Sequence, residues 1–582
     1  MATADANSPQ RETTPSLTSS SIPQKRALFE AEDHSPAVSS PLNPDVATKN
    51  PKVQIQAPED ASSQTMAREK RTKKDSLKKR ESKGATGSGS GGIDSSRSSP
   101  VPNKPPKEQP SEMAPLRYKL APPKPTDFDL ARGPIFTPHH EIPSFSPDQP
   151  PIEFFETSDH VYNKKSFHYT HCIADPTFPS MFYYRNTEPA PFGAHISFED
   201  AASHIYFNKS GTHLTTDKGF RMARANVAVR EGKWYWECKV TRGISPTPGS
   251  PSNGHVRIGF ARREASLDAP VGFDAYSYGL RDASGQKVHM SRPKDFFPPG
   301  ESILEGDVIG LEINLPSQHL HRKIVSGTYN PAIDLDTSYS SSSPSLSEIE
   351  YPNIIRDRIP IRFKAHIYFE KIDYHTTKEL EELMNPSPVG PAAAAGATPP
   401  NPLHPSPALR TLPGSYIRVY KNGKLIGEPW RDLLCFLPPA SKMGTGAGSG
   451  VQNGREVMDD GEVGYYPAVS VFRGGAVEVN FGEKGWWFPP QQEEKGEDVE
   501  MGGVEGPEEK KEEEEKGSGV GRPISERYDE MIVEDIVYDV IDEVGFWAMG
   551  VGRDRVGGKA GPEKGGMGAE NDEEIKELVQ DD

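Results

Sequence analysis

Short stretches in the middle of the chain alternate between hydrophobic and polar residues. In 233–240 every second residue is apolar, and the same alternation recurs in 307–315 and 476–481. A period of two places alternate side chains on opposite faces of a β-strand. Within 416–426 an Asn-Gly pair separates two such runs, which predicts a tight hairpin. The pattern therefore predicts an all-β antiparallel sandwich in which each sheet buries one face.

A different period appears in 524–546, near the C-terminal end. Its apolar residues recur at intervals of three and four, the spacing of one face of an α-helix, and acidic residues cover most of the remaining surface. We expect an amphipathic helix whose apolar stripe no adjacent domain covers. The alternative is that this helix folds back on the sandwich. The stripe residues are Val533, Ile536, Val537, Val540 and Val544, with Ile541 beside them.

Composition limits how much of the chain we expect to fold. Hydrophobic residues make up 34% of the 582 residues, and the 53 glycines and 57 prolines exceed ordinary globular usage. This balance favours one domain of roughly 250 residues with long disordered arms. The expected divisions are a disordered Ser/Pro-rich arm (1–150), the β-domain (151–490) with loop insertions near 316–360, 386–413 and 441–461, an acidic linker (491–523), the helix (524–546) and a flexible tail (547–582).

Charge is unevenly distributed around a net value of −17. Acidic residues are concentrated in 493–516, within the expected acidic linker, whereas the run 68–83 is strongly basic. The basic run is typical of a nuclear localisation signal or of an arm that contacts the phosphates of nucleosomal DNA, and the two roles can coexist. A solvated linker is the simpler alternative.

The chain shows little that points to catalysis or to a bound cofactor. Three cysteines without Cys-x-x-Cys spacing indicate a reducing, intracellular compartment, and we find neither a signal peptide nor a membrane-spanning run. His168, His171 and Cys172 suggest zinc, but no second ligand pair follows at a suitable spacing, so we predict no metal site. No nucleophile–base order or paired carboxylates stand out. We expect a protein that binds other proteins and not an enzyme.

A series of motifs resembles the SPRY (B30.2-like) domain of the Ash-two/Bre-two family, which belongs to COMPASS-type histone methyltransferase complexes. Two of the motifs, Gly232-Lys-Trp-Tyr-Trp-Glu and Gly306-Asp-Val-Ile-Gly, occur in SPRY domains generally. The motif Ala269-Pro-Val-Gly-Phe-Asp-Ala-Tyr-Ser-Tyr narrows the resemblance to this family. Further matches are Gly219-Phe-Arg-Met-Ala-Arg-Ala, Val256-Arg-Ile-Gly-Phe-Ala, Phe363-Lys-Ala-His-Ile-Tyr-Phe-Glu, Val419-Tyr-Lys-Asn-Gly and Tyr466-Pro-Ala-Val-Ser. Animal relatives also carry a Cys-rich zinc module and a winged helix, and the N-terminal part of this sequence shows neither the cysteines nor the pattern. The chain is therefore similar to the shorter fungal type.

The resemblance implies a non-catalytic nuclear scaffold with two binding surfaces. In the family, the SPRY surface grips an acidic segment of a WD-repeat subunit, and the matching positions here are Phe220, Arg257, Pro270, Phe273 and Arg281. Relatives carry Tyr at the two Phe positions, so hydrogen bonds of those hydroxyls are missing here. The terminal helix matches the segment that docks on a small dimeric subunit of the Dpy-thirty/Sdc-one type. Together these contacts would order a catalytic SET-domain subunit that methylates lysine four of histone H3.

Two other functions stay open from the residues alone. A SPRY adaptor of another kind, such as a ubiquitin-ligase receptor or a Ran-binding-type protein, would carry a RING, SOCS-box or LisH-like companion, and we see none. A methyltransferase would need a Gly-rich cofactor turn or a SET signature, and neither is visible. For Arg257 and Arg281 the structural alternatives are a strand-edge salt bridge and a solvated turn.

Overall fold

A computed structural model describes most of the predicted β-domain and the terminal helix. The described residues are 123–144, 150–163, 167–176, 184–337, 354–356, 359–364, 366–385, 398–444, 458–490 and 521–548. All of them belong to one compact unit, 53–579. The basic run 68–83, the stretch 491–520 and the tail from 549 onward lie outside the described residues.

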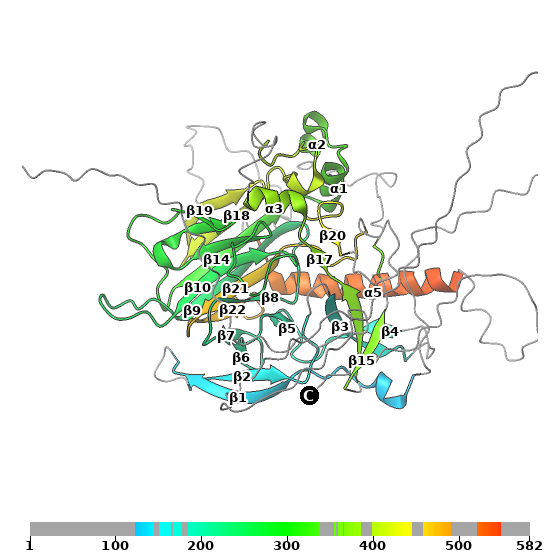
Figure 1. Cartoon of the computed structure of the whole chain (residues 1–582), viewed down its shortest axis with the longest axis horizontal. Helices are drawn as coiled ribbons and strands as arrows, with labels where there is room; N and C mark the ends of the chain where they lie inside the picture. The colour runs from blue at the N-terminus through cyan, green and yellow to red at the C-terminus, as the bar shows by residue number, and fades with distance from the viewer. Residues whose placement is uncertain are drawn as a thin grey trace, which may run out of the picture. The chain divides into compact units, whose positions relative to one another are not determined.

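Two antiparallel sheets form the sandwich (Figure 1). The larger sheet has the order β1 (Ile135–Ile142), β2 (Ile152–Ser158), β6 (Tyr206–Phe207), β7 (His213–Thr215), β22 (Ala476–Asn480), β9 (Gly232–Arg242), β14 (Val308–Leu315), β18 (Tyr416–Lys421), β19 (Lys424–Arg431). The smaller sheet has the order β13 (Arg292–Lys294), β12 (Lys287–His289), β11 (Ser277–Arg281), β10 (His255–Ala261), β21 (Tyr466–Phe472), β8 (Arg221–Ala225), β5 (Ile196–Ala201). The prediction of an all-β sandwich is confirmed.

Alternating side chains of the two sheets meet in one core. Trp236 of β9 is fully buried, and its ring lies 6.2 Å from that of Phe260 on β10 in an edge-to-face arrangement. Burial of such aromatic side chains removes large apolar areas from water and supplies much of the driving force for folding. The predicted hairpin is also present, because β18 and β19 meet at Asn422 (φ +51°) and Gly423 (φ +81°).

The fold begins earlier than predicted. A short 3₁₀ helix, η1 (Pro125–Phe128), and strand β1 precede residue 151, where we expected the domain to start, and β1 pairs along its length with β2. Strand β1 contains a proline and two adjacent histidines, and most of its residues are exposed or half-buried. As an edge strand it therefore lacks the apolar alternation that marks the other strands. The described part of the chain therefore begins at residue 123, inside the stretch that we predicted as the arm, and residues 1–122 lie outside the described residues.

Smaller elements complete the structure. A second cluster of strands has the order β15 (Pro360–Phe363), β16 (His366–Ile372), β3 (Phe167–Ala174), β4 (Tyr184–Asn186), and β17 (Tyr374–His375) pairs with β20 (Lys442–Met443). The remaining short helices are η2 (Ala283–Gly285), α2 (Pro331–Thr337), α3 (Lys378–Met384) and η3 (Pro407–Leu409).

The insertion predicted near 316–360 is in part a core element. Helix α1 (Gln318–Ser326) begins after Ser317, whose hydroxyl accepts a hydrogen bond from the Leu320 amide, and it ends at Gly327 in the left-handed conformation. Its buried residues Leu320, Ile324 and Val325 belong to the main core. The Ser-rich composition of the whole stretch concealed this short amphipathic helix.

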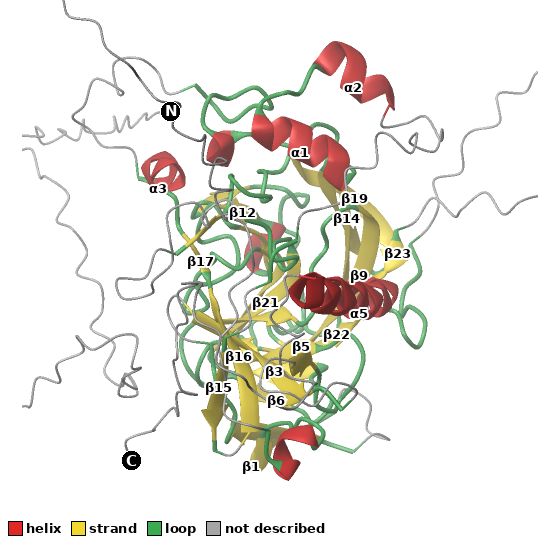
Figure 2. Cartoon of the chain, turned by 90° about the vertical axis from the view of Figure 1, so that its right-hand side faces the viewer, coloured by secondary structure: helices red, strands yellow, loops and turns green. Residues whose placement is uncertain are grey.

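The terminal helix α5 (Ile524–Ala548) confirms the helix predicted over 524–546. Just before it, the two-residue strand β23 (Arg522–Pro523) pairs in parallel with the start of β9, so the helix starts at the sheet (Figure 2). Gly521 fits here because a Cβ atom would lie 2.8 Å from the Trp234 backbone. Among the described helices, none has the length and hydropathy needed to cross a membrane.

Candidate partner-binding surfaces

The two predicted arginines are direct neighbours across the smaller sheet. Arg257 on β10 pairs in register with Arg281 on β11, which places both side chains on the same face. The guanidinium carbon of Arg257 lies 5.0 Å from the centre of the Phe220 ring, and that ring lies 4.7 Å from the ring of Phe472. The sheet therefore supports a cation on an aromatic platform.

Neither member of this arginine pair forms an ion pair within the part of the chain that the structure describes. The nearby carboxylate of Asp282 acts on Arg257 only from a distance, and the Nε atom of Arg257 is buried without a hydrogen-bond partner. Burial, and secondly the charge of Arg281, lower the pKa of Arg257 to about 10, so it remains a cation at neutral pH. Two adjacent cations with unused donors favour a ligand that supplies carboxylates. The structural alternative for Arg257, a salt bridge at the strand edge, is therefore absent among the described residues.

The predicted Pro270 and Phe273 lie in the turn beside this pair. The Phe273 amide donates to the Pro270 carbonyl at 3.0 Å, and Arg257 Nη1 makes a long 3.5 Å contact with the carbonyl of Val271 in the same turn. Gly272 has φ +85°, and a Cβ atom there would lie 2.4 Å from the Val288 carbonyl, so the turn requires glycine. Phe273 is 51% exposed. We call Phe220, Arg257, Pro270, Phe273 and Arg281 the arginine–aromatic face.

The predicted apolar stripe of α5 faces solvent. Each of its residues is between 48% and 61% exposed, as is the neighbouring Ile541 at 58%. A row of exposed branched side chains on one helix face is the arrangement that an apolar groove of a partner recognises. We call Val533, Ile536, Val537, Val540 and Val544 the valine stripe.

The opposite face of α5 packs on the sandwich, so both expectations for this helix are partly correct. Near its start, Ile524 and Tyr528 are buried in the main core, and the buried Arg527 donates to the Ala228 carbonyl. The helix therefore folds back as the alternative supposed, yet the valine stripe points away from the domain. Sequence periodicity located the stripe correctly but gave no information about the other face.

Two arginines hold the acidic side of α5. Arg356, only 3% exposed, lies 2.8 Å from Asp535, bonds to Asp539 and lies 3.9 Å from Asp542. Arg185 lies 3.3 Å from Glu543. The sequence analysis missed both arginines, because each lies far from the helix in the chain and shows no local motif. An excess of acids on one helix face was the available signal that such cations exist.

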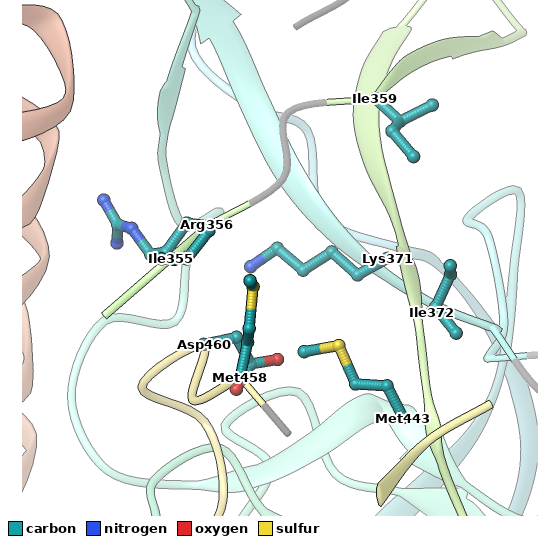
Figure 3. Close-up of a pocket in the computed structure, with 8 residues that line it drawn as sticks. All are labelled: Ile355, Arg356, Ile359, Lys371, Ile372, Met443, Met458 and Asp460. Carbon is teal, nitrogen blue, oxygen red and sulfur yellow. The ribbon is translucent and has the colours of Figure 1, made fainter. Parts of the chain in front are cut away.

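Figure 3 shows a small cavity beside α5 from which Arg356 points toward the helix, while Lys371 points across the cavity. Its volume of about 20 Å³ is that of one water molecule. It is therefore too small for an organic ligand. The lining residues are Ile355, Arg356, Ile359, Lys371, Ile372, Met443, Met458 and Asp460.

The three residues that suggested zinc do not converge on one point. His168 Nε2 lies 2.7 Å from Glu462, whereas His171 Nε2 lies 3.1 Å from Glu199. The described residues do bring His168, Asp460 and Glu462 together. However, the ammonium of Lys371 bonds to Glu462 as well, and a cation in that position opposes a metal ion. This cluster is an internal ion network.

A half-buried carboxyl group also anchors α5. Tyr528 Oη donates a 2.5 Å hydrogen bond to Glu188, and burial raises the pKa of Glu188 to about 7. The pKa in the folded state is thus above the ordinary value of 4.5, so Glu188 supports the fold in its protonated form. This support is complete below about pH 4.5 and is lost as the pH rises through about 7.

We expect Glu188→Gln to remove this pH dependence. Chemical denaturation of the wild type and the variant at about pH 5 and about pH 8 should show that the wild type loses about 1–3 kcal/mol relative to the variant as the pH rises. Glu526→Gln, which changes a carboxylate on the outer side of the same helix, is the control and should preserve the wild-type profile. Parallel stability profiles of wild type and Glu188→Gln would contradict the assignment.

Comparison with known proteins identifies the family. The COMPASS component cclA of Colletotrichum higginsianum is 57% identical over 578 residues, which cover 97% of this chain and 96% of that protein. The chain belongs to the family of fungal COMPASS components named cclA. Other members of this COMPASS-component group include the Set1 complex component ash2 of Schizosaccharomyces pombe (36% identical, 74% of this chain and 52% of that protein). The COMPASS component BRE2 of Saccharomyces cerevisiae is 26% identical over 67% of this chain and 89% of its own length.

Other comparisons add less to the cclA-family assignment. No protein-family model matches the chain. A crystal structure of a human SPRY domain covers 48% of this chain and 95% of its own, with 14% identity and a TM-score of 0.22. That likeness is too slight to support an argument, and the all-β sandwich is established by the strand order itself.

Proposed function

We propose that this cclA-family protein is a non-catalytic scaffold of a nuclear COMPASS-type complex that methylates lysine four of histone H3. The observation that carries the proposal is the presence of two accessible and chemically different surfaces, the arginine–aromatic face and the valine stripe, on one domain. The 57% identity to a COMPASS component over nearly the whole chain supports the assignment to this type of complex. A scaffold of this kind raises activity by restricting the motion of a catalytic SET-domain subunit.

The arginine–aromatic face suits an acidic, extended segment of a WD-repeat subunit. Guanidinium groups pair with carboxylates through two parallel hydrogen bonds, and the aromatic and proline side chains provide apolar contact between those bonds. Phe at 220 and 273 contributes ring contact without a hydroxyl, so the ion pairs carry a larger share of the binding here. The exposed Phe273 ring is free to cover the bound segment.

The valine stripe suits a small dimeric subunit of the Dpy-thirty/Sdc-one type, whose two chains form an apolar groove. The anchors follow one another at intervals of three and four residues, as helix-in-groove recognition requires. Because the docked face of α5 is fixed by Ile524, Tyr528 and Arg356, the stripe is presented without further ordering of the helix start. Less ordering entropy is then lost on binding.

Removal of both arginines tests the first surface. Arg257→Ala combined with Arg281→Ala should weaken binding of the WD-repeat subunit at least about 100-fold, because two charged contacts of about 1.5–3 kcal/mol each are lost. The wild-type interaction should also weaken as salt rises, and the variant should show a smaller salt dependence. Calorimetric titration at two salt concentrations measures both effects.

Lys424→Ala combined with Arg431→Ala provides the matched control, since it removes two exposed cations from the far edge of the other sheet. This control should bind as the wild type does. Normal binding by the Arg257/Arg281 double variant would show that the face is wrongly assigned.

The main rival is a SPRY adaptor outside COMPASS, such as a ubiquitin-ligase receptor. Affinity purification of the tagged protein followed by mass spectrometry separates the two proposals, because ours requires WD-repeat, SET-domain and small dimeric subunits together. Methyl transfer by the purified chain alone would contradict the non-catalytic role. We further propose that the basic run 68–83 directs nuclear import or contacts nucleosomal DNA.

A further inference from the structure

Aromatic contacts continue beyond the arginine–aromatic face. The Phe220 ring, which lies under Arg257, packs 4.7 Å from the ring of Phe472 at the end of β21. The guanidinium carbon of the next residue, Arg473, lies 5.1 Å from the centre of the Phe472 ring. The result is a continuous row of cation, ring, ring and cation, formed by Arg257, Phe220, Phe472 and Arg473. Neither Phe472 nor Arg473 was among the predicted site residues.

Arg473 is held in place by an unusual backbone conformation. Its φ angle is +46°, in a turn completed by Gly474 at φ +91°, and its amide donates to the Lys218 carbonyl at 2.8 Å. A non-glycine residue is disfavoured in this left-handed region. Because glycine would fit this turn without that cost, the geometry indicates that the side chain of Arg473 has a use.

The side chain of Arg473 is exposed and pairs with no carboxylate among the residues that the structure describes. The row therefore ends in cations at both sides, Arg257 with Arg281 at one end and Arg473 at the other, and its middle is apolar. A binding partner that matches this order has acidic groups at two ends and an apolar or small side chain between them.

We infer that Phe472 and Arg473 extend the arginine–aromatic face, so that it takes an extended acidic segment whose outer carboxylates lie about four residues apart. The inference rests on the proposed function of the same face. Contacts of 5.0, 4.7 and 5.1 Å along the row separate Arg257 from Arg473 by at most about 15 Å. An extended chain advances roughly 3.3 Å per residue, so four residues span about 13 Å.

Three fluorescein-labelled ten-residue peptides with a Gly/Ser background test this spacing on the full chain. The first has glutamates at positions 2, 3 and 7, the second has glutamine at position 7, and the third has glutamine at positions 2 and 3. Fluorescence anisotropy measures their affinities. We expect the first peptide to bind roughly 3–10-fold more tightly than the second, which is the usual range for one partly exposed charged contact.

Variants assign the difference to single residues. Arg473→Gln should reduce the affinity for the first peptide to that for the second, and it should leave the affinity for the second unchanged. Arg257→Ala with Arg281→Ala should weaken both. Lys424→Gln, an exposed lysine on β19 of the other sheet, is the charge-matched control and should change neither affinity.

The outcomes separate the inference from the proposed function. The extension would be overturned if the wild type bound the first two peptides equally, or if Arg473→Gln and Lys424→Gln had equal effects. In either case the Arg257/Arg281 result would still support the arginine–aromatic face. Failure of the wild type to bind the first peptide more tightly than the third would overturn both. Phe472→Leu should reproduce part of the Arg473→Gln effect, because it retains apolar volume and removes the ring below the guanidinium.

Discussion

Val537→Asp should abolish capture of the small dimeric subunit and leave the sandwich folded. Val537 lies at the centre of the valine stripe and is 48% exposed in the free chain, so an aspartate there stays hydrated until the partner binds. Burial of that carboxylate in an apolar groove costs several kcal/mol, which corresponds to a loss of affinity of about 100-fold or more. Co-purification of the two subunits, followed by titration, measures the loss.

Val537→Ile is the matched control for this variant. It keeps a β-branched apolar side chain on the same face and should bind within about threefold of the wild type. The free energy of unfolding of both variants should stay within about 0.5 kcal/mol of the wild type, because the site is on the surface. Wild-type capture by Val537→Asp would mean that the partner contacts another part of the chain.

Arg356→Ala should release the second half of α5 from the sandwich without preventing capture of the small dimer. The first turns of the helix are held by Ile524 and Tyr528 in the apolar core, whereas the later turns depend on carboxylates that surround Arg356. Removal of one partner from a buried ion network typically costs about 3–5 kcal/mol. Amide hydrogen exchange in 535–548 should therefore accelerate by roughly 100-fold or more, while exchange in 524–530 changes little.

Arg322→Ala is the comparison variant, because this half-buried arginine of α1 contacts Gln318 and no described carboxylate of α5. It should leave exchange in α5 unchanged. The Arg356→Ala chain should still bind the small dimer, since the valine stripe lies on the opposite face, but should activate the assembled methyltransferase less. Unchanged exchange in 535–548 would show that Arg356 does not hold the helix.

The sequence predicted those elements that show a regular apolar period. Strands β9 and β14 alternate clearly because their apolar face meets the core, and the valine stripe keeps helical spacing because its residues share one face. The expectation that the other face of each sheet is wet was wrong for β9 and β14, because Tyr235, Glu237 and Glu312 on that face are buried as well. Strand β1 escaped prediction since an edge strand with little burial needs no such pattern. Helix α1 escaped because its nine residues lie within a long Ser-rich stretch.

The candidate sites were likewise predictable from the sequence only in part. Arg257 and Arg281 could be named from family motifs, but the absence of a described carboxylate partner, which supports the proposed binding role, depends on strands that meet only in the folded chain. The contacts of Arg356 with α5 and of Phe472 with Phe220 join segments that are far apart in sequence. No local pattern encodes such contacts, so only the three-dimensional structure shows them.

The parallel pairing of β23 with β9 has a consequence for how this family can vary. The chain leaves the sandwich after Pro490 and is fixed to it again at Gly521, whose amide donates to the buried Glu312 at 3.1 Å. Because both ends of the acidic stretch 491–520 are fixed on the domain, residues added to it or removed from it need not move the sandwich or α5. Its length and composition can therefore drift during evolution while the arginine–aromatic face and the valine stripe keep a fixed distance and orientation.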